Sequence, residues 1–279
     1  QLNGKSSTAH GPNENYAAES SIDFDSAQLG WKRRNISSKF DNILLRSRSS
    51  GGRIPQHIVD REIQENLRSL VNDVNTDLVG DGTGSSGKVF TGIKAALSTS
   101  GSYAGIDRGV VTGWQPTISD AASASLSTTI LDAHMLAMWN KGVITSDTEI
   151  WVGPALYRQF QDLDKDSIRY APGDQMGSLK PHYTRQGMDV PVYLVKDMPA
   201  DEVWVLDMSQ IRLRFLDGSD PASLSGLEGA DQTTMIEGAP VHVEARNPTG
   251  QDNKAYTWKI WGQLAVLNPR TCGAIINLT

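Results

Sequence analysis

Residues 55–93 read PQHIVDREIQENLRSLVNDVNTDLVGDGTGSSGKVFTGI, a run in which a helical pattern passes into a glycine-rich one. In the first part, apolar residues recur mostly three or four positions apart, which predicts an amphipathic helix over about 55–79. Pro55 suits the first turn of a helix, and Gly80 is placed to end it. The apolar stripe consists of Val59, Ile63, Leu67, Leu70, Val71, Val74 and Leu78.

The glycine-rich part raises the question of a nucleotide site, because Gly82, Gly87 and Lys88 fit the phosphate-loop pattern G-x-x-x-x-G-K. A phosphate loop needs a hydroxyl after the lysine to hold magnesium, and this chain has Val89 there. Such a loop also follows a buried strand and opens a helix, whereas this one follows a helix. The stretch therefore favours a helix end followed by a loop. A nucleotide-binding enzyme that uses Gly82–Lys88 stays the second alternative.

The composition is that of an ordinary globular protein, with 38% hydrophobic and 21% charged residues in a chain of 279. No apolar run approaches the ~18 residues of a membrane span, so no membrane partner is expected. The single cysteine, Cys272, excludes an internal disulfide framework and is expected to be buried. Five scattered histidines have no zinc-site spacing, so neither a metal nor any other cofactor is expected.

Charge is distributed unevenly along the chain. Residues 26–53 carry seven basic side chains and only Asp41 as an acidic one, a net charge of +6. The whole chain has a net charge of −6, which leaves −12 on the remainder. This balance argues against a nucleic-acid binder that depends on phosphate contacts. A basic segment on an acidic body indicates either head-to-tail contact between copies or a solvated basic loop.

Residues 16–53 contain short strand-like stretches, such as SSIDFDS and WKRRNISSKF, with too few apolar residues for a core of their own. They predict two extended strands joined as a protruding hairpin. An isolated two-stranded hairpin is marginally stable in water. The hairpin therefore needs another surface, from this chain or from a neighbouring copy.

The rest of the chain mixes helical and strand patterns, which predicts an α+β protein. A second helix is expected to begin after Thr117, with Asp120 completing a capping box, and to end at Gly142. Its stripe would include Leu126 and Ile130, and His134 would lie on a helix face without binding a metal. A short helix should begin at Pro154. Strands are expected within residues 148–153, 189–197, 203–208, 211–216, 241–247, 256–269 and 272–278, and a polar insertion within 217–232.

Five stretches, taken in order, resemble the major capsid proteins of tailed bacteriophages, which have the Hong Kong 97 type fold. The helix of residues 55–79 resembles the family's spine helix, and GDGTGSSGKVFTGI resembles the glycine loop that follows it. DTEIWVGPALYRQFQDL resembles a strand-then-helix piece of the family. VPVYLVKDMPADEVWVLDMSQIRLRF resembles its strand–turn–strand, and WGQLAVLNPRTCGAIINL resembles its closing strands. The shared order and spacing span essentially the whole chain.

The resemblance implies a Hong Kong 97 type capsid fold with five parts. The N-arm would be residues 1–15 and the E-loop hairpin residues 16–53. Residues 54–117 would be the part of the peripheral P-domain that holds the spine helix and the glycine loop. An axial A-domain would follow in residues 118–210, and residues 211–279 would be the return strands of the P-domain.

The implied function is structural and not enzymatic: copies would assemble into the pentamers and hexamers of an icosahedral phage head enclosing double-stranded DNA. The DNA would be held without sequence-specific binding. Further partners implied during assembly in the host cytoplasm are a scaffold or maturation protease, a portal and cement proteins, and the final location would be the virion. An encapsulin-like protein compartment, which has the same fold, is the first alternative.

Contacts between copies are expected to involve the basic hairpin and the acidic face of the helix over residues 55–79. Trp31, Phe40, Ile43 and Leu44 would supply apolar contact to the neighbour. The basic side chains Lys32, Arg33, Arg34, Arg46 and Arg48 would meet carboxylates such as Glu62, Glu65 and Asp73. No catalytic residue is expected.

Overall fold

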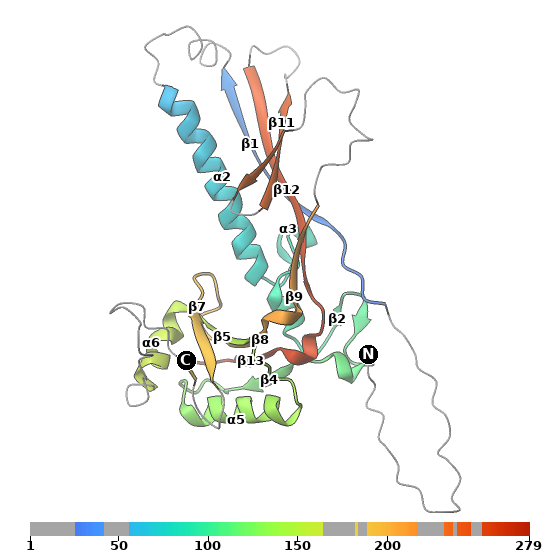
Figure 1. Ribbon diagram of the computed structural model, residues 1–279, viewed down its shortest axis with the longest axis vertical. Coiled ribbons are helices and arrows are strands. Elements are labelled where there is room, and N and C mark those ends of the chain that lie inside the picture. Colours follow the sequence, from blue (N-terminus) through green and yellow to red (C-terminus); the bar gives the residue numbers. More distant parts are fainter. Residues whose placement is uncertain are drawn as a thin grey trace, which may run out of the picture. The chain divides into compact units, whose positions relative to one another are not determined.

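The computed structural model of the chain describes residues 26–41, 56–163, 182–183, 189–216, 232–236, 239–246 and 253–279. The chain forms two compact units (Figure 1). Unit 1 comprises Gln1–Leu29, Lys94–Ile211 and Val266–Thr279, and unit 2 comprises Gly30–Ile93 and Arg212–Ala265. The predicted N-arm, most of the polar insertion, and residues 16–25 and 42–53 of the predicted hairpin lie outside the described residues. The assignment of residues to a P-domain and an A-domain stays a prediction.

Unit 2 is built on a five-stranded sheet with the order β1-β12-β11-β10, in which β9 also pairs with β12. Its strands are β1 (Lys32–Asp41), β9 (Ile211–Phe215), β10 (Gln232–Ile236), β11 (Ala239–Arg246) and β12 (Asn253–Val266). The long helix α2 (Gln56–Val79) lies along β1 (Figure 1). Between helix and sheet is a core of Phe40, Leu70, Val74, Phe90, Val241, Trp258 and Ile260.

The predicted helix over residues 55–79 is confirmed almost to the residue, because both its stripe and its end signals are local. Its apolar positions Leu70 and Val74 are buried, while intervening residues such as Arg68 and Asn72 are exposed. The helix ends where expected: the N–H of Gly80 donates to the carbonyls of Thr76 and Asp77. Beyond it, Gly82 has a left-handed φ of 78°, a conformation that glycine adopts without steric cost.

The described strand of the predicted hairpin finds its second surface within its own chain. Strand β1 pairs antiparallel with β12, with Lys32 opposite Gly262 and Asp41 opposite Asn253. Burial alternates along the strand, and Phe40 packs edge-on against Tyr256 with ring centroids 5.8 Å apart. The alternation that indicated a strand is therefore confirmed. The need for a partner is met by β12 and α2 in the part of the hairpin that the structure describes.

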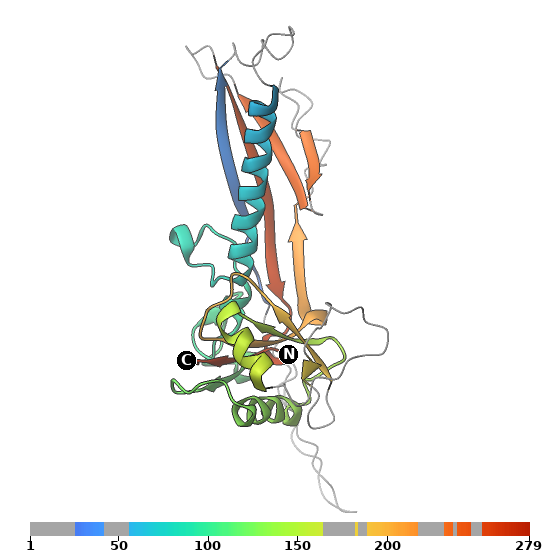
Figure 2. The same ribbon diagram turned by 90° about the vertical axis from the view of Figure 1, so that its left-hand side faces the viewer.

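Unit 1 contains a six-stranded mixed sheet with the order β4-β13-β8-β5-β7-β6. Its strands are β4 (Thr117–Asp120), β5 (Thr148–Val152), β6 (His182–Tyr183), β7 (Val190–Leu194), β8 (Val203–Asp207) and β13 (Gly273–Ile276). Strand β13 lies parallel to β4 and antiparallel to β8. Helices α5 (Thr128–Asn140) and α6 (Pro154–Leu163) complete the unit's core (Figure 2). The α+β class is confirmed.

The second helix begins later than predicted. Thr117–Asp120 forms strand β4, and α5 begins at Thr128, where the hydroxyl oxygen of the N-cap Ser127 accepts from the N–H of Ile130 at 3.3 Å. The expected capping box at Thr117 and Asp120 is therefore wrong. Pairing with β13, which lies far along the chain, overrides the local helix signal. The buried face of α5 consists of Leu131, His134, Met135 and Met138.

Leu126, expected in the stripe of the second helix, precedes α5, whereas the predicted end of this helix and the burial of Cys272 are confirmed. Helix α5 ends at Asn140, two residues before Gly142, which has a left-handed φ of 66°. Cys272 is buried, and its burial raises the pKa of the thiol to about 11.

The other described elements of the chain are short. They are α3 (Gly84–Gly87), α4 (Ile93–Ala96), β2 (Ser102–Tyr103), β3 (Ile106–Asp107), and the 3-10 turns Thr112–Trp114, Met208–Gln210 and Pro269–Thr271.

Candidate assembly surface

The two faces of β1 have different environments. Lys32 and Arg34 point to the half-buried face of the strand, whereas Arg33 lies on the exposed face. Trp31, just before the strand, has 56% of its surface exposed. The sheet pleat explains this division, because successive side chains point to opposite faces. The basic run of the sequence is thus divided between one side that contacts the chain and one that faces outward.

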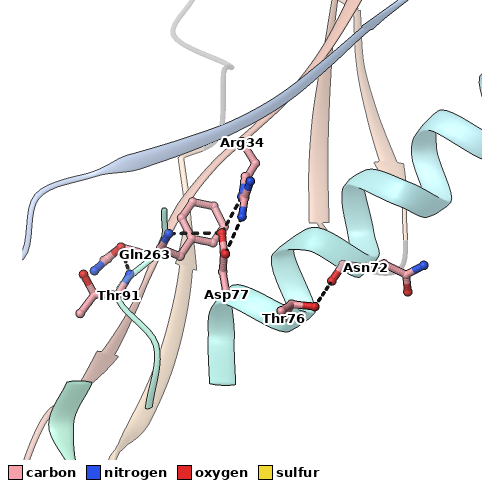
Figure 3. A network of polar contacts seen from close by, with 7 residues as sticks. Arg34, Asn72, Thr76, Asp77, Thr91 and Gln263 are labelled. Atoms are coloured by element: carbon pink, nitrogen blue, oxygen red, sulfur yellow. Dashed lines mark hydrogen bonds and ion pairs between the residues drawn. The ribbon is translucent and has the colours of Figure 1, made fainter. Parts of the chain in front are cut away.

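Arg34 joins β1 to the end of α2 through a bidentate ion pair with Asp77 (Figure 3). Its Nε and one terminal nitrogen each donate to a different oxygen of Asp77, both at 2.6 Å. The Asp77 side chain is only 7% exposed, and the N–H of Phe90 also donates to it at 3.4 Å. The hydrogen bonds to Asp77 raise the pKa of Arg34. One carboxylate therefore connects the strand, the helix end and the glycine loop, defined here as residues 80–92.

The glycine loop returns closely over the end of α2. A side chain at Gly92 would collide with the carbonyl oxygens of Asp77, Leu78 and Gly80. The N–H of Thr91 donates to the side-chain oxygen of Gln263 on β12 at 3.4 Å (Figure 3). These contacts hold the second half of the loop against the helix and the sheet of unit 2.

A pocket of about 430 Å³ lies between the start of β1 and the middle of the glycine loop. The ammonium group of Lys32 donates to the carbonyl oxygen of Gly87, which links the two walls. Within the described part of the chain, Arg33 and Lys88 make no ion pair. The lining contains four basic residues and no acidic one: it consists of Trp31, Lys32, Arg33, Arg34, Asn35, Ser85, Gly87, Lys88 and Val89.

Glu62, Glu65 and Asp73, which are predicted to form an acidic face of α2, are all exposed, and so are Arg61 and Arg68. Glu65 accepts from Arg61 one helical turn earlier at 2.8 Å, and Glu62 accepts from the hydroxyl of Ser38 at 3.3 Å. Pairs this exposed contribute little to stability. Glu62, Glu65 and Asp73 therefore keep most of their charge available at the surface.

The predicted contact residues fall into three groups. Lys32, Arg34 and Phe40 contact their own chain, through the bond to Gly87, the ion pair and the core of unit 2. Trp31 and Arg33 are exposed, as are the three carboxylates of α2. The remaining four, Ile43, Leu44, Arg46 and Arg48, lie outside the described residues. Their role between copies stays a prediction.

Sequence reasoning missed Asp77 and Lys88. Asp77 continues the buried positions 70 and 74 of the α2 stripe, so an acid on an apolar face was an available signal. The sequence pattern suggests only a nucleotide-ligand role for Lys88, because its place opposite β1 depends on non-local packing.

Solved structures of capsid shells have the same architecture as this chain. The cyanophage A-1(L) capsid is similar with a TM-score of 0.64 at 17% identity, covering 89% of this chain and 77% of that chain. The capsid of an empty GTA particle gives 0.53 at 11% identity, covering 96% and 81%. The holo-SrpI encapsulin of Synechococcus elongatus gives 0.52 at 11% identity, covering 89% and 74%. These likenesses establish the fold, which is the Hong Kong 97 type capsid fold.

The family follows from the sequence itself. The model of the SU10 major capsid protein matches residues 50–279, so the chain belongs to the SU10 major capsid protein family. It is a structural protein of the virion that assembles into a capsid shell, and the alternative of a nucleotide-binding enzyme is wrong. No curated protein matches the chain. Of the described helices, none has the length and apolar character that crossing a bilayer requires.

Proposed function

We propose that copies of this chain form the pentamers and hexamers of an icosahedral tailed-phage head that encloses double-stranded DNA. The match to a major capsid protein over residues 50–279 carries the proposal. Rings of this kind close through head-to-tail contacts, in which two different surfaces of each copy meet. The chain offers two surfaces of opposite charge, the basic exposed face at the start of β1 and the acidic face of α2.

In this arrangement Trp31 supplies apolar contact to the next copy, and Arg33 meets Glu62, Glu65 or Asp73 of that copy. Exposed aromatic and arginine residues are the types most often found at the energetic centre of interfaces. Residues 43–48 would extend the same contact. Lys32 and Arg34 position β1 within their own chain, so they would act on the interface indirectly.

Head assembly would take place in the host cytoplasm, with a scaffold or a maturation protease, a portal and cement proteins as partners. The packaged DNA would be held without sequence-specific contacts, which fits the net charge of −6. Residues 118–210 would surround the axis of each ring as the A-domain, and residues 54–117 with 211–279 would form the P-domain.

Electron microscopy of the purified protein tests the proposal. We expect closed shells with pentameric and hexameric units. A protein that stays monomeric under every assembly condition would contradict it, and particles that hold a protein cargo in place of DNA would favour the encapsulin-like alternative.

The variant Trp31→Ala tests the contact. We expect it to lower shell yield while the melting temperature of the unassembled subunit is unchanged, because the Trp31 side chain is 56% exposed. The conservative variant Trp31→Phe should retain most of the yield. A deletion of the whole hairpin is unsuitable, since it would remove β1 from the sheet of unit 2.

A further inference from the structure

The pocket between β1 and the glycine loop is unusual in its charge. Of its four basic residues, Arg34 is matched by Asp77 through two short hydrogen bonds. Lys32 donates to a backbone carbonyl, which leaves its positive charge uncompensated. Arg33 and Lys88 have no acidic partner in the described part of the chain, and no carboxylate lines the pocket. A concave site with this surplus of positive charge attracts an anion.

The pocket is held in shape before any ligand arrives. The ladder to β12 and the pair with Asp77 fix the β1 wall. The opposite wall is held by the bond from Lys32 to Gly87, next to Ser85 and Ser86, which both have left-handed φ angles of 48° and 58°. Such angles cost a non-glycine residue about 1–2 kcal/mol each. A preformed wall lowers the ordering cost that binding otherwise incurs.

Two observations favour a carboxylate side chain over a nucleic-acid phosphate as the anion. The site is small, about 430 Å³, at the low end of the range for small-ligand pockets, and Trp31 and Val89 add apolar surface that suits the stem of a side chain. Outside residues 26–53 the chain has a net charge of −12. That surface repels DNA but offers many carboxylates to a second copy.

We propose that this pocket binds an aspartate or glutamate side chain of a second copy of the chain, with Arg33 and Lys88 as its charged partners. The inference deepens the proposed function and rests on it, because the second copy is the neighbour in the shell. The contact between copies then includes Lys88 and the glycine loop in addition to the basic hairpin.

Charge reversal is the first test. The variant Arg33→Glu/Lys88→Glu should lower the yield of shells by about tenfold or more, because repulsion replaces two attractions. The matched control is Arg214→Glu/Lys254→Glu, which makes the same change of net charge at exposed positions of unit 2 outside both the pocket and α2. The control should assemble like the wild type. Equal yields for the two variants would overturn the pocket while leaving shell formation intact. A wild type that forms no shells would overturn both proposals.

Zero-length carbodiimide coupling of wild-type shells is the second test, and it does not depend on a variant that could fail to fold. Shells made from isotope-labelled and unlabelled copies should yield mixed-label peptides that join Lys88 to an aspartate or glutamate of another copy. Lys88→Arg keeps the charge, so it should assemble normally and lose this peptide. Cross-links from Lys88 only within one copy would overturn the proposal. The proposal would also be overturned if Arg33→Glu/Lys88→Glu shells formed in normal yield and their only defect were a lower DNA content.

Discussion

Gly92 allows the glycine loop and the end of α2 to pack backbone against backbone. A Cβ at this position would lie well inside van der Waals contact with three carbonyl oxygens, which belong to the backbone and cannot rotate away. We expect Gly92→Ala to lower the free energy of unfolding of the unassembled subunit by about 3 kcal/mol or more. Urea denaturation measures this change.

The control for this prediction is Gly30→Ala in the same unit, where an added Cβ meets nothing within 4 Å. It should change the free energy of unfolding by about 0.5 kcal/mol or less. If the two variants proved equally stable, the close approach at Gly92 would be wrong.

His134 is a buried histidine that should make unit 1 sensitive to acid. Its Nδ1 lies 2.8 Å from the hydroxyl of Ser119, and burial, with a smaller effect from Lys141, lowers its pKa from 6.5 to about 4. Burial disfavours protonation of His134 in the folded state, so the unfolded state binds this proton first as the pH falls below 6.5. Stability is therefore lost progressively between about pH 6.5 and pH 4, by about 3 kcal/mol in total.

The variant His134→Gln cannot titrate, so its free energy of unfolding should fall by about 2 kcal/mol less than that of the wild type between neutral pH and about pH 5. Parallel slopes for wild type and His134→Gln in urea titrations would contradict the prediction.

At the scale of single elements, the sequence predicted best what local contacts determine. Helix α2 has its stripe and its stop signal within residues 55–80, and strand β8 begins with four consecutive apolar residues. The local sequence predicts the start of a helix at β4, because the pairing that makes this segment a strand comes from the distant β13. The pairing of β1 with β12 could not be predicted either, since Lys32 and Gly262 are far apart in the sequence and meet only in the fold.

The candidate surface was predictable in part for the same reason. Charge and exposure along one strand or helix identified Arg33 and the acidic positions of α2. Only the three-dimensional arrangement shows which basic side chains pair within the chain. Arg34 pairs with Asp77, so it no longer counts among the residues that face a neighbouring copy. The pocket itself joins two segments about 50 residues apart, so no local pattern could indicate it.

The Arg34–Asp77 pair should hold β1 to α2. Replacing Arg34 by Ala leaves the buried Asp77 carboxylate with the N–H of Phe90 as its remaining described hydrogen-bond donor, which should cost about 2 kcal/mol of stability. Backbone amides of β1 should then exchange hydrogen faster, as mass spectrometry can measure. Arg33→Ala is the control, because this neighbouring side chain is exposed. Identical exchange in both variants would mean that the pair does not restrain the strand.

For the molecule as a whole, the separation of charge between residues 26–53 and the remainder should make assembly depend on salt. Arg33→Glu should lower the initial assembly rate most at low ionic strength, where charges act over about 10 Å or more. The deficit should shrink towards about 1 M salt, where the screening length is about 3 Å. Light scattering follows the rate, and a deficit that is the same at all salt concentrations would point to lost packing and not to lost charge.

The position of β13 in the sheet of unit 1 has a consequence for synthesis on the ribosome. This strand lies between β4 and β8, yet it is translated after both of them. Until residues 273–276 have emerged, β4 lacks its partner and β8 has one open edge. A nascent chain that stalls earlier therefore cannot complete its sheet, and it exposes unpaired edges of β4 and β8 that can pair with other chains.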